Sequence, residues 1–136
     1  MLTFFFVPFL FSIVAPQQDE IEILFDGHSL SGWETTDENI WKVENGVIVG
    51  GNLSLPTPKN SFLFHKKEFD DFELKLQFLL EGFPEKGMVN SGVQFRSEKF
   101  GGGEARGYQA DIGDPTWWGS LYDEHRRNRV LASSDM

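Results

Sequence analysis

The sequence predicts an all-β protein with the architecture of an antiparallel β-sandwich or jelly roll. Short runs of alternating apolar and polar residues recur along the chain from Asp19 onward. Turn residues separate these runs roughly every 8–15 residues, which is typical of sandwiches and barrels. No segment keeps a helical period over three turns. The 136 residues are enough for one domain.

The composition excludes several classes of protein. The chain has no Cys, which excludes a disulfide framework and a thiolate metal site. It has 12 Lys and Arg against 21 Asp and Glu, for a net charge of −9. This balance disfavours binding to nucleic acid or to anionic lipid surfaces.

The N-terminus resembles an export signal. Residues 2–15 are almost all apolar, and the first charge of the chain is Asp19. A membrane span needs roughly 20 apolar residues, so this run is too short and fits the apolar region of a cleaved signal. We therefore expect a signal peptide at 1–18, cleavage near Ala15, a domain at 19–136, and a secreted or periplasmic protein with no membrane span after cleavage. The alternatives are a retained apolar anchor or a buried N-terminal strand, because no Lys or Arg precedes the apolar run.

The first half of the mature chain predicts several strands in order. "IEILFDG" (21–27) alternates and closes on Asp-Gly. "WKVENGVIVGG" (41–51) predicts a hairpin around Asn45-Gly46, the strongest short hairpin signal. "NSFLFHKKEFDDFELKLQFLLEG" (60–82) predicts two more strands, the second with one apolar and one polar face.

Two further strands are predicted in the second half. They are "SGVQFRS" (91–97) and "YQADIGD" (108–114), and "EKFGGGEARG" (98–107) between them is expected to be a flexible connector. The expected core comprises Trp33, Trp41, Val43, Val47, Phe62, Phe64, Leu74, Leu76, Phe78, Val93, Phe95, Tyr108, Ala110 and Ile112.

The polar faces of three strands are the candidate functional surface. Alternation places their polar residues opposite the core, where they form either a concave polar groove or only the solvated face of a sheet. These residues are Glu73, Lys75, Gln77, Gln94, Arg96, Gln109 and Asp111.

The motifs together resemble one family. "LFDGHSLSGW" (24–33), the hairpin above, "DFELKLQF" (71–78), "NSGVQFRS" (90–97) and "GYQADIG…WWGSLYDEHRRN" (107–128) are similar, in this order, to the 3-keto-disaccharide hydrolase domain family. The resemblance implies a concanavalin A-like, laminin G-like jelly roll, export, and activity on carbohydrates oxidised at C3. It covers about 23–132 and resembles the N-terminal two-thirds of such a domain, so we expect an incomplete sandwich. The strand reads Gly-Tyr-Gln-Ala-Asp-Ile rather than Gly-Tyr-Glu-Val-Gln-Ile, which moves the carboxylate by two residues along one face.

The implied substrate defines the groups that the site needs. A ketone at C3 acidifies the proton on C2, so a base can remove it and the C1 substituent can leave; water then adds. The site needs a base, a donor or cation for the enolate oxygen, and an acid for the leaving oxygen. We assign Asp111 as the base and Glu124 as the third catalytic group. Arg96 is assigned either to polarising the ketone or to holding the sugar. The expected substrate-binding residues are Asn90, Gln94, Gln109, Trp117, Trp118, Tyr122, Asp123 and His125.

Each assignment has an alternative. Asp111 could instead only pair with Arg96 across the sheet, and Asn90 could be a turn residue. Either Trp117 or Trp118 is expected in the core, because adjacent strand residues face opposite ways. No motif has metal-ligand spacing, so no metal ligands are assigned, although a divalent metal would also polarise the ketone. The alternative functions are a non-catalytic carbohydrate-binding jelly roll and an inactive fragment of a longer hydrolase.

Overall fold

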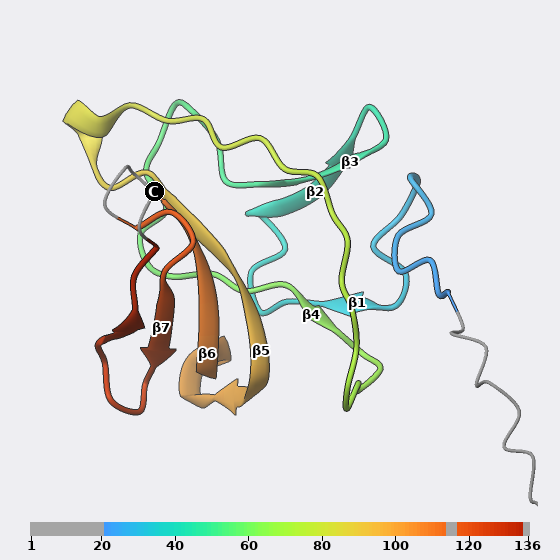
Figure 1. The fold of residues 1–136 in the computed structure, drawn as a ribbon. Coiled ribbons are helices and arrows are strands. Elements are labelled where there is room, and N and C mark those ends of the chain that lie inside the picture. The colour runs from blue at the N-terminus through green and yellow to red at the C-terminus, as the bar shows by residue number, and fades with distance from the viewer. Residues whose placement is uncertain (1–20, 114–116, 135–136) are drawn as a thin grey trace, which may run out of the picture.

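The computed structural model describes residues 21–113 and 117–134. Within these ranges the chain is all-β and antiparallel, with short 3₁₀ turns as its only helical pieces (Figure 1). The predicted fold class is therefore confirmed, and the arrangement is consistent with a β-sandwich. No helix in the described ranges is long and apolar enough to cross a membrane. The strands are β1 (Trp33–Glu34), β2 (Trp41–Glu44), β3 (Val47–Gly50), β4 (Phe64–His65), β5 (Asn90–Phe100), β6 (Glu104–Gly113), β7 (Leu121–Glu124) and β8 (Val130–Ala132).

The largest element is a four-stranded sheet in the order β5-β6-β7-β8. Its neighbours follow one another in sequence, so it is a meander of hairpins (Figure 1). The 3₁₀ turn Gly101–Gly103 joins β5 to β6, and the residues on either side of it are paired. The glycine-rich stretch, expected to be a flexible connector, is thus mostly strand around a tight turn.

The pairing of β5 with β6 contains a bulge that matters for the site. The register shifts between Phe95 and Glu98, and Arg96 has a positive φ of 48°. Ser97 then lies against Gly107, where a Cβ would come within 2.6 Å of the Ser97 Cα. The bulge therefore needs a glycine opposite it, and it removes Arg96 from the alternating row of β5.

The hairpin predicted around Asn45-Gly46 is confirmed. β2 and β3 pair directly across the two-residue turn, from Glu44 opposite Val47 to Trp41 opposite Gly50. Asn45 and Gly46 have φ values of 51° and 79°, as the twist of a two-residue hairpin requires.

Two predicted strands do not form. Residues 21–27 are irregular, and within 60–82 the structure has only the two-residue β4. Residues 71–79, where a strand was expected, have no ladder partner among the described residues. Alternation shows that one face is apolar, but a strand also requires a neighbour to pair with. The sheet gains β7 and β8 instead, which the sequence reading did not separate from the polar cluster at 121–129.

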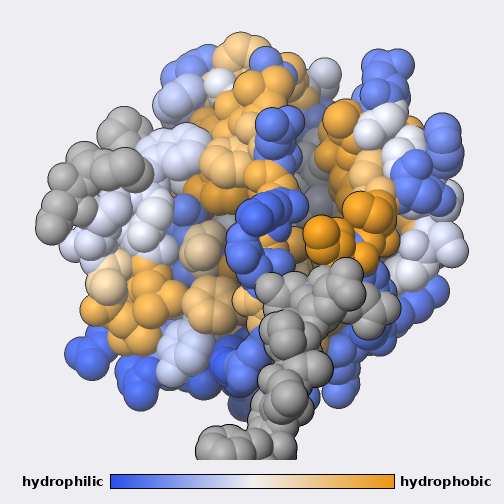
Figure 2. Space-filling model, turned by 45° about the vertical axis from the view of Figure 1, so that its right-hand side comes forward, coloured by the Kyte–Doolittle hydropathy of each residue, from blue (hydrophilic) through white to orange (hydrophobic). Residues whose placement is uncertain are grey.

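The expected core is much less buried than predicted. Among the described residues the one fully buried apolar side chain is Ala105. Val47, Leu74, Leu76 and Phe78 are 55%, 40%, 49% and 51% exposed. Ala110 is also exposed, and the other expected core residues are half-buried. For the expected core residues of β5, β6 and 71–78, the reason is that the apolar face of the two strands meets residues 70–78 across a groove of about 810 Å³. Hydrophobic residues are accordingly spread over the face of the molecule in Figure 2.

Candidate active site

Strand register gathers polar side chains on one face of the sheet. Gln94 of β5 lies opposite Gln109 of β6, which lies opposite Tyr122 of β7. Asp111 lies opposite Gly92 on one side, and its N–H donates to the Ser120 carbonyl on the other, at 2.9 Å. Because residues directly opposite each other share a face, these side chains lie on one surface.

A chain of side-chain hydrogen bonds runs along this surface and ends at Asp111. Ser97 Oγ donates to Gln94 Oε1 at 2.8 Å, and Gln94 Nε2 donates to Gln109 Oε1 at 3.1 Å. Gln109 Nε2 donates to Asp111 Oδ1 at 2.6 Å. Each amide uses its oxygen on one side and its N–H on the other, so the chain fixes the orientation of the group that faces the carboxylate.

The Asp111 carboxyl is buried and half satisfied. The residue is 4% exposed, and its Oδ2 has no hydrogen-bond partner among the described residues. Burial raises the pKa of Asp111, and the hydrogen bond from Gln109 opposes that rise. A buried carboxylate oxygen without a donor is costly, and such groups concentrate at functional sites.

Two acidic groups on β7 accompany Asp111. Burial raises the pKa of Tyr122, and the charges of Glu124 and Asp111 raise it further. Burial also raises the pKa of Glu124, against the opposing effect of His125. Glu124 pairs opposite Gly107, four residues along β6 from Asp111, or roughly 13 Å along the strand. Tyr122 lies between these two carboxyl groups.

The two tryptophans contact different sides of the sheet, although they lie in a turn before β7 rather than in a strand, and both are half-buried. Trp117 contacts the Tyr122 ring edge-on, with centroids 6.3 Å apart, and packs over Gly113. Trp118 instead stacks on Phe78, with centroids 5.6 Å apart. Trp117 is therefore at the polar face, whereas Trp118 belongs to the apolar side of the sheet. Asn90, expected as a ligand or a turn residue, begins β5 opposite Gly113, at the Trp117 end of the face.

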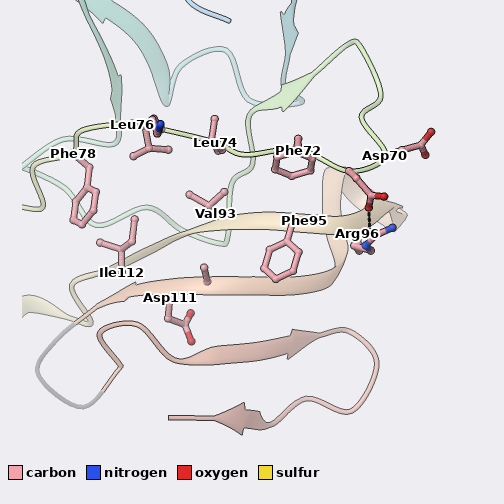
Figure 3. A pocket seen from close by; sticks show the side chains of 13 residues that line it. Asp70, Phe72, Leu74, Leu76, Phe78, Val93, Phe95, Arg96, Asp111 and Ile112 are labelled. Atoms are coloured by element: carbon pink, nitrogen blue, oxygen red, sulfur yellow. Dashed lines mark hydrogen bonds and ion pairs between the residues drawn. The ribbon is translucent and has the colours of Figure 1, made fainter. Parts of the chain in front are cut away.

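The expected placement of Arg96 is corrected by the structure. Arg96 was expected beside Asp111, but its guanidinium pairs with Asp71 at 2.6 Å, and both side chains are exposed. Figure 3 shows this pair at one end of the groove, with the Asp111 side chain directed away from it. The bulge in β5 is the cause, because Ser97 takes the place on the polar face that strict alternation gives to Arg96.

Asp123, expected to bind substrate, is also placed elsewhere. It lies opposite Tyr108, on the other face of the sheet, and is fully buried. Its carboxylate accepts hydrogen bonds from Arg126 Nε at 2.6 Å and from Arg127 Nη1 at 2.8 Å. Burial opposes ionisation of Asp123, but the two arginines outweigh it and lower its pKa. Asp123 therefore holds the β7–β8 turn together rather than facing the site.

His125 lies at the edge of the candidate site. Its φ is 52°, and its Nε2 lies 2.7 Å from Glu104 Oε2 and 3.6 Å from Glu124 Oε1. The ring also packs on Phe100, with centroids 4.9 Å apart. His125 thus connects Glu124 to the start of β6 and is half-buried.

Sequence reasoning missed several residues of the site. Ser97 anchors the amide chain, and Ser120 is buried beside Asp111. Gly92 leaves room for Gln109, since a Cβ there would come within 2.6 Å of Gln109 Cδ. The signal for Gly92 was its position, because a glycine inside an alternating strand often marks a close approach.

The described residues contain no group of three or more His, Asp or Glu side chains placed to hold a metal ion.

Comparisons with known proteins give one match. Neither the curated proteins nor the solved structures contain a significant match to this chain. Residues 20–135 match the family described as the 3-keto-alpha-glucoside-1,2-lyase-like domain. This match covers nearly all of the sequence, and the chain therefore belongs to the 3-keto-alpha-glucoside-1,2-lyase-like domain family.

Proposed function

We propose that the chain cleaves glycosides that carry a ketone at C3, by elimination across C1 and C2 on the polar face of β5–β7. The family description names a 1,2-lyase for 3-keto-α-glucosides, which is a reaction of this type. The observation that carries the proposal is Asp111 Oδ2, a buried carboxylate oxygen without a hydrogen-bond partner among the described residues.

Asp111 acts as the base in this proposal. Its Oδ2 takes the proton from C2, which the neighbouring ketone acidifies, and the electron pair moves into an enolate with its charge on the C3 oxygen. Burial raises the pKa of Asp111 and so strengthens it as a base, while Gln109 holds the other carboxylate oxygen. Because the carboxyl is covered, substrate entry must displace a side chain that lies over it.

Tyr122 and Glu124 act on the C3 oxygen and on the oxygen that leaves C1, respectively. Tyr122 lies between the carboxyl groups and donates its O–H to the C3 oxygen, and its raised pKa keeps it protonated. Glu124, whose pKa burial also raises, lies too far along the strands from Asp111 for both to reach one sugar bond, so through a bridging water it gives its proton to the oxygen that leaves C1. The enolate electrons form the C1–C2 double bond as the C1–O bond breaks. Addition of water, with OH to C1 and H to C2, completes net hydrolysis.

The remaining groups of the polar face bind the carbohydrate. Trp117 and the ring of Tyr122 offer aromatic surface to the C–H face of a pyranose, and exposed Asn90 lies at the same end. Gln94 and Gln109 already bond to each other, so they serve mainly to orient Asp111. Arg96, paired with Asp71 away from Asp111, has no part in this mechanism. We also propose that the chain is exported, in keeping with an extracellular carbohydrate substrate.

The test is Asp111→Asn, assayed on a 3-keto-glucoside and on the unoxidised glucoside. General base catalysis contributes roughly 10²–10⁴-fold, so kcat should fall by that factor. Exposed Glu38→Gln removes a carboxylate elsewhere and should leave kcat unchanged. Wild-type protein in D₂O should place deuterium at C2 of the keto sugar. Full activity in Asp111→Asn, or equal turnover of the unoxidised sugar, would overturn the mechanism.

A second candidate is a carbohydrate-binding module without catalysis. The pair of Trp117 and Tyr122 favours it, because an aromatic surface binds sugars without any acid or base. In that case Asp111→Asn would retain binding of the glycoside, Trp117→Ala would lose it, and no deuterium would enter C2.

A further inference from the structure

Residues 71–79 form a segment whose backbone has no hydrogen-bond partner among the described residues. Every residue from 71 to 79 is exposed, and none makes a backbone hydrogen bond to another described residue. Backbone N–H and C=O groups in an extended run form a template for pairing with another strand. In Figure 3 the segment runs across the groove from the apolar face of β5 and β6.

The two faces of this segment differ sharply in chemistry. Its apolar side chains line the groove together with Val93, Phe95 and Ile112 of the sheet (Figure 3). Glu73 and Lys75 alternate with these apolar side chains and form an ion pair at 2.7 Å, with side chains 74% and 84% exposed, and Lys75 also borders the groove. The apolar row consists of Phe72, Leu74, Leu76 and Phe78, each 40% or more exposed.

We propose that this segment pairs antiparallel with the same segment of a second copy of the chain, forming a symmetric dimer. Such pairing satisfies the free backbone groups of both copies. It also places the two apolar rows side by side, so that each covers the exposed edge of the other.

The register follows from side-chain chemistry. Residues directly opposite each other in an antiparallel pair share a face. The two apolar rows therefore lie on the same face only when even-numbered residues of one copy are opposite even-numbered residues of the other. Centring the pair on Leu74 places Glu73 of each copy opposite Lys75 of the other, giving two opposite-charge pairs. The same register sets Phe72 opposite Leu76 twice and Leu74 opposite itself.

The two neighbouring registers that also pair even-numbered with even-numbered residues place like charges opposite each other. Centring on Lys75 brings two lysines directly opposite each other, and centring on Glu73 does the same for two glutamates. Like charges directly opposite are destabilising in a sheet. The charge pattern of the segment is therefore complementary to itself in the register centred on Leu74.

Asp111 is among the residues that line the groove, but its carboxyl belongs to the opposite side of the sheet. The segment faces the apolar side of β5 and β6, whereas the carboxyl of Asp111 is directed to the other side of the sheet (Figure 3). The dimer therefore does not depend on the proposed reaction, and each can fail without the other.

Sedimentation velocity of the full chain over a range of concentrations tests the proposal. Wild type should show a monomer–dimer equilibrium. Glu73→Lys turns both cross-strand pairs into Lys–Lys contacts and should weaken the dimer about tenfold or more. Lys75→Glu should do the same, and the double variant with both changes should restore the dimer. Glu81→Lys makes the same charge change at an exposed position outside the paired residues and should dimerise like wild type.

Three outcomes would overturn the proposal. The first is a wild type that is monomeric at every concentration, which would leave the groove to a strand from a different polypeptide. The second is a wild type that forms only open-ended aggregates, since a symmetric pair is closed. The third is a Glu73→Lys variant that dimerises as well as Glu81→Lys, because the interface would then lie elsewhere.

Discussion

Replacing Asp111 by Asn is expected to stabilise the fold at neutral pH while removing the proposed base. Asn keeps the oxygen that accepts from Gln109 Nε2 at 2.6 Å. It also removes a charge from a residue that is 4% exposed and whose Oδ2 has no partner among the described residues. Residues that serve function at the expense of stability behave in this way, because their groups stay unsatisfied until a ligand binds.

The size of the effect follows from the unsatisfied oxygen. A buried polar group without a hydrogen bond costs about 1–3 kcal/mol. The Asn variant still leaves one N–H unpaired, so it recovers only the part due to the charge, or about 1–2 kcal/mol. For a domain of this size each kcal/mol raises Tm by roughly 3–5 °C.

The pH dependence gives the sharper test. The pKa of Asp111 is raised in the folded state, so its proton is held more tightly there than in the unfolded chain. Wild type therefore gains stability as pH falls through the folded pKa, until both states are protonated below the ordinary Asp value of about 3.9. The advantage of Asp111→Asn should accordingly be full at pH 7 and vanish at low pH.

Urea unfolding of both proteins across this pH range measures the difference, with Glu38→Gln as a control for loss of an exposed carboxylate. A variant less stable than wild type at pH 7 would show that Asp111 is satisfied in the folded protein. An advantage that does not change with pH would show that charge burial is not its cause. Either result would refute the reasoning.

Three further predictions concern the same surface and the leader. Glu124→Gln should lower the pKa of Tyr122, measured by phenolate absorbance. The decrease should be larger than in Asp111→Asn, because the charge of Glu124 contributes more to raising this pKa. An unchanged pKa in both variants would show that these carboxylates do not act on Tyr122. Gly92→Ala should destabilise the chain by roughly 1–3 kcal/mol in urea unfolding, because its Cβ would come within 2.6 Å of Gln109 Cδ. Gly101→Ala, with nothing within 4 Å of its Cβ, should be nearly neutral, and equal effects would contradict the packing argument. Finally, the exported protein should begin near Pro16 to Asp19 by mass spectrometry, and an intact Met1 on a cytosolic protein would contradict the signal-peptide assignment.

The parts of the fold that were predictable are those that local sequence determines. Asn45-Gly46 sets the β2–β3 hairpin through its two positive φ values, and the alternation at 91–97 and 108–113 sets the long β5–β6 pair. The segment 71–79 has equally clear alternation but no strand partner among the described residues. Pairing is a property of two segments, and a single pattern cannot provide it.

The site was predictable as far as alternation held. Gln94, Gln109 and Asp111 share a face, as the period of two requires. Arg96 left that face because one bulge shifts every later residue of β5, and the only local signs were Ser97 and a glycine at 107. Asp123 was misplaced for a different reason. The positive φ values of His125 and Asn128 turn the chain back, so that the following arginines reach Asp123 from its own loop.

The two faces of the β5–β6 pair are linked through their register. A slip of one residue would move Asp111 to the apolar side and expose Ile112 in its place. The hydrogen-bonded polar row and the apolar lining of the groove therefore both require the same register. β5 pairs only with β6 among the described strands, and the apolar face of this pair borders the groove. Covering the apolar face through segment 71–79 would therefore hold β5 in register against β6. A chain kept monomeric by Glu73→Lys should show faster amide exchange along β5 than the dimer, and equal exchange in both would show that the segment does not hold this strand.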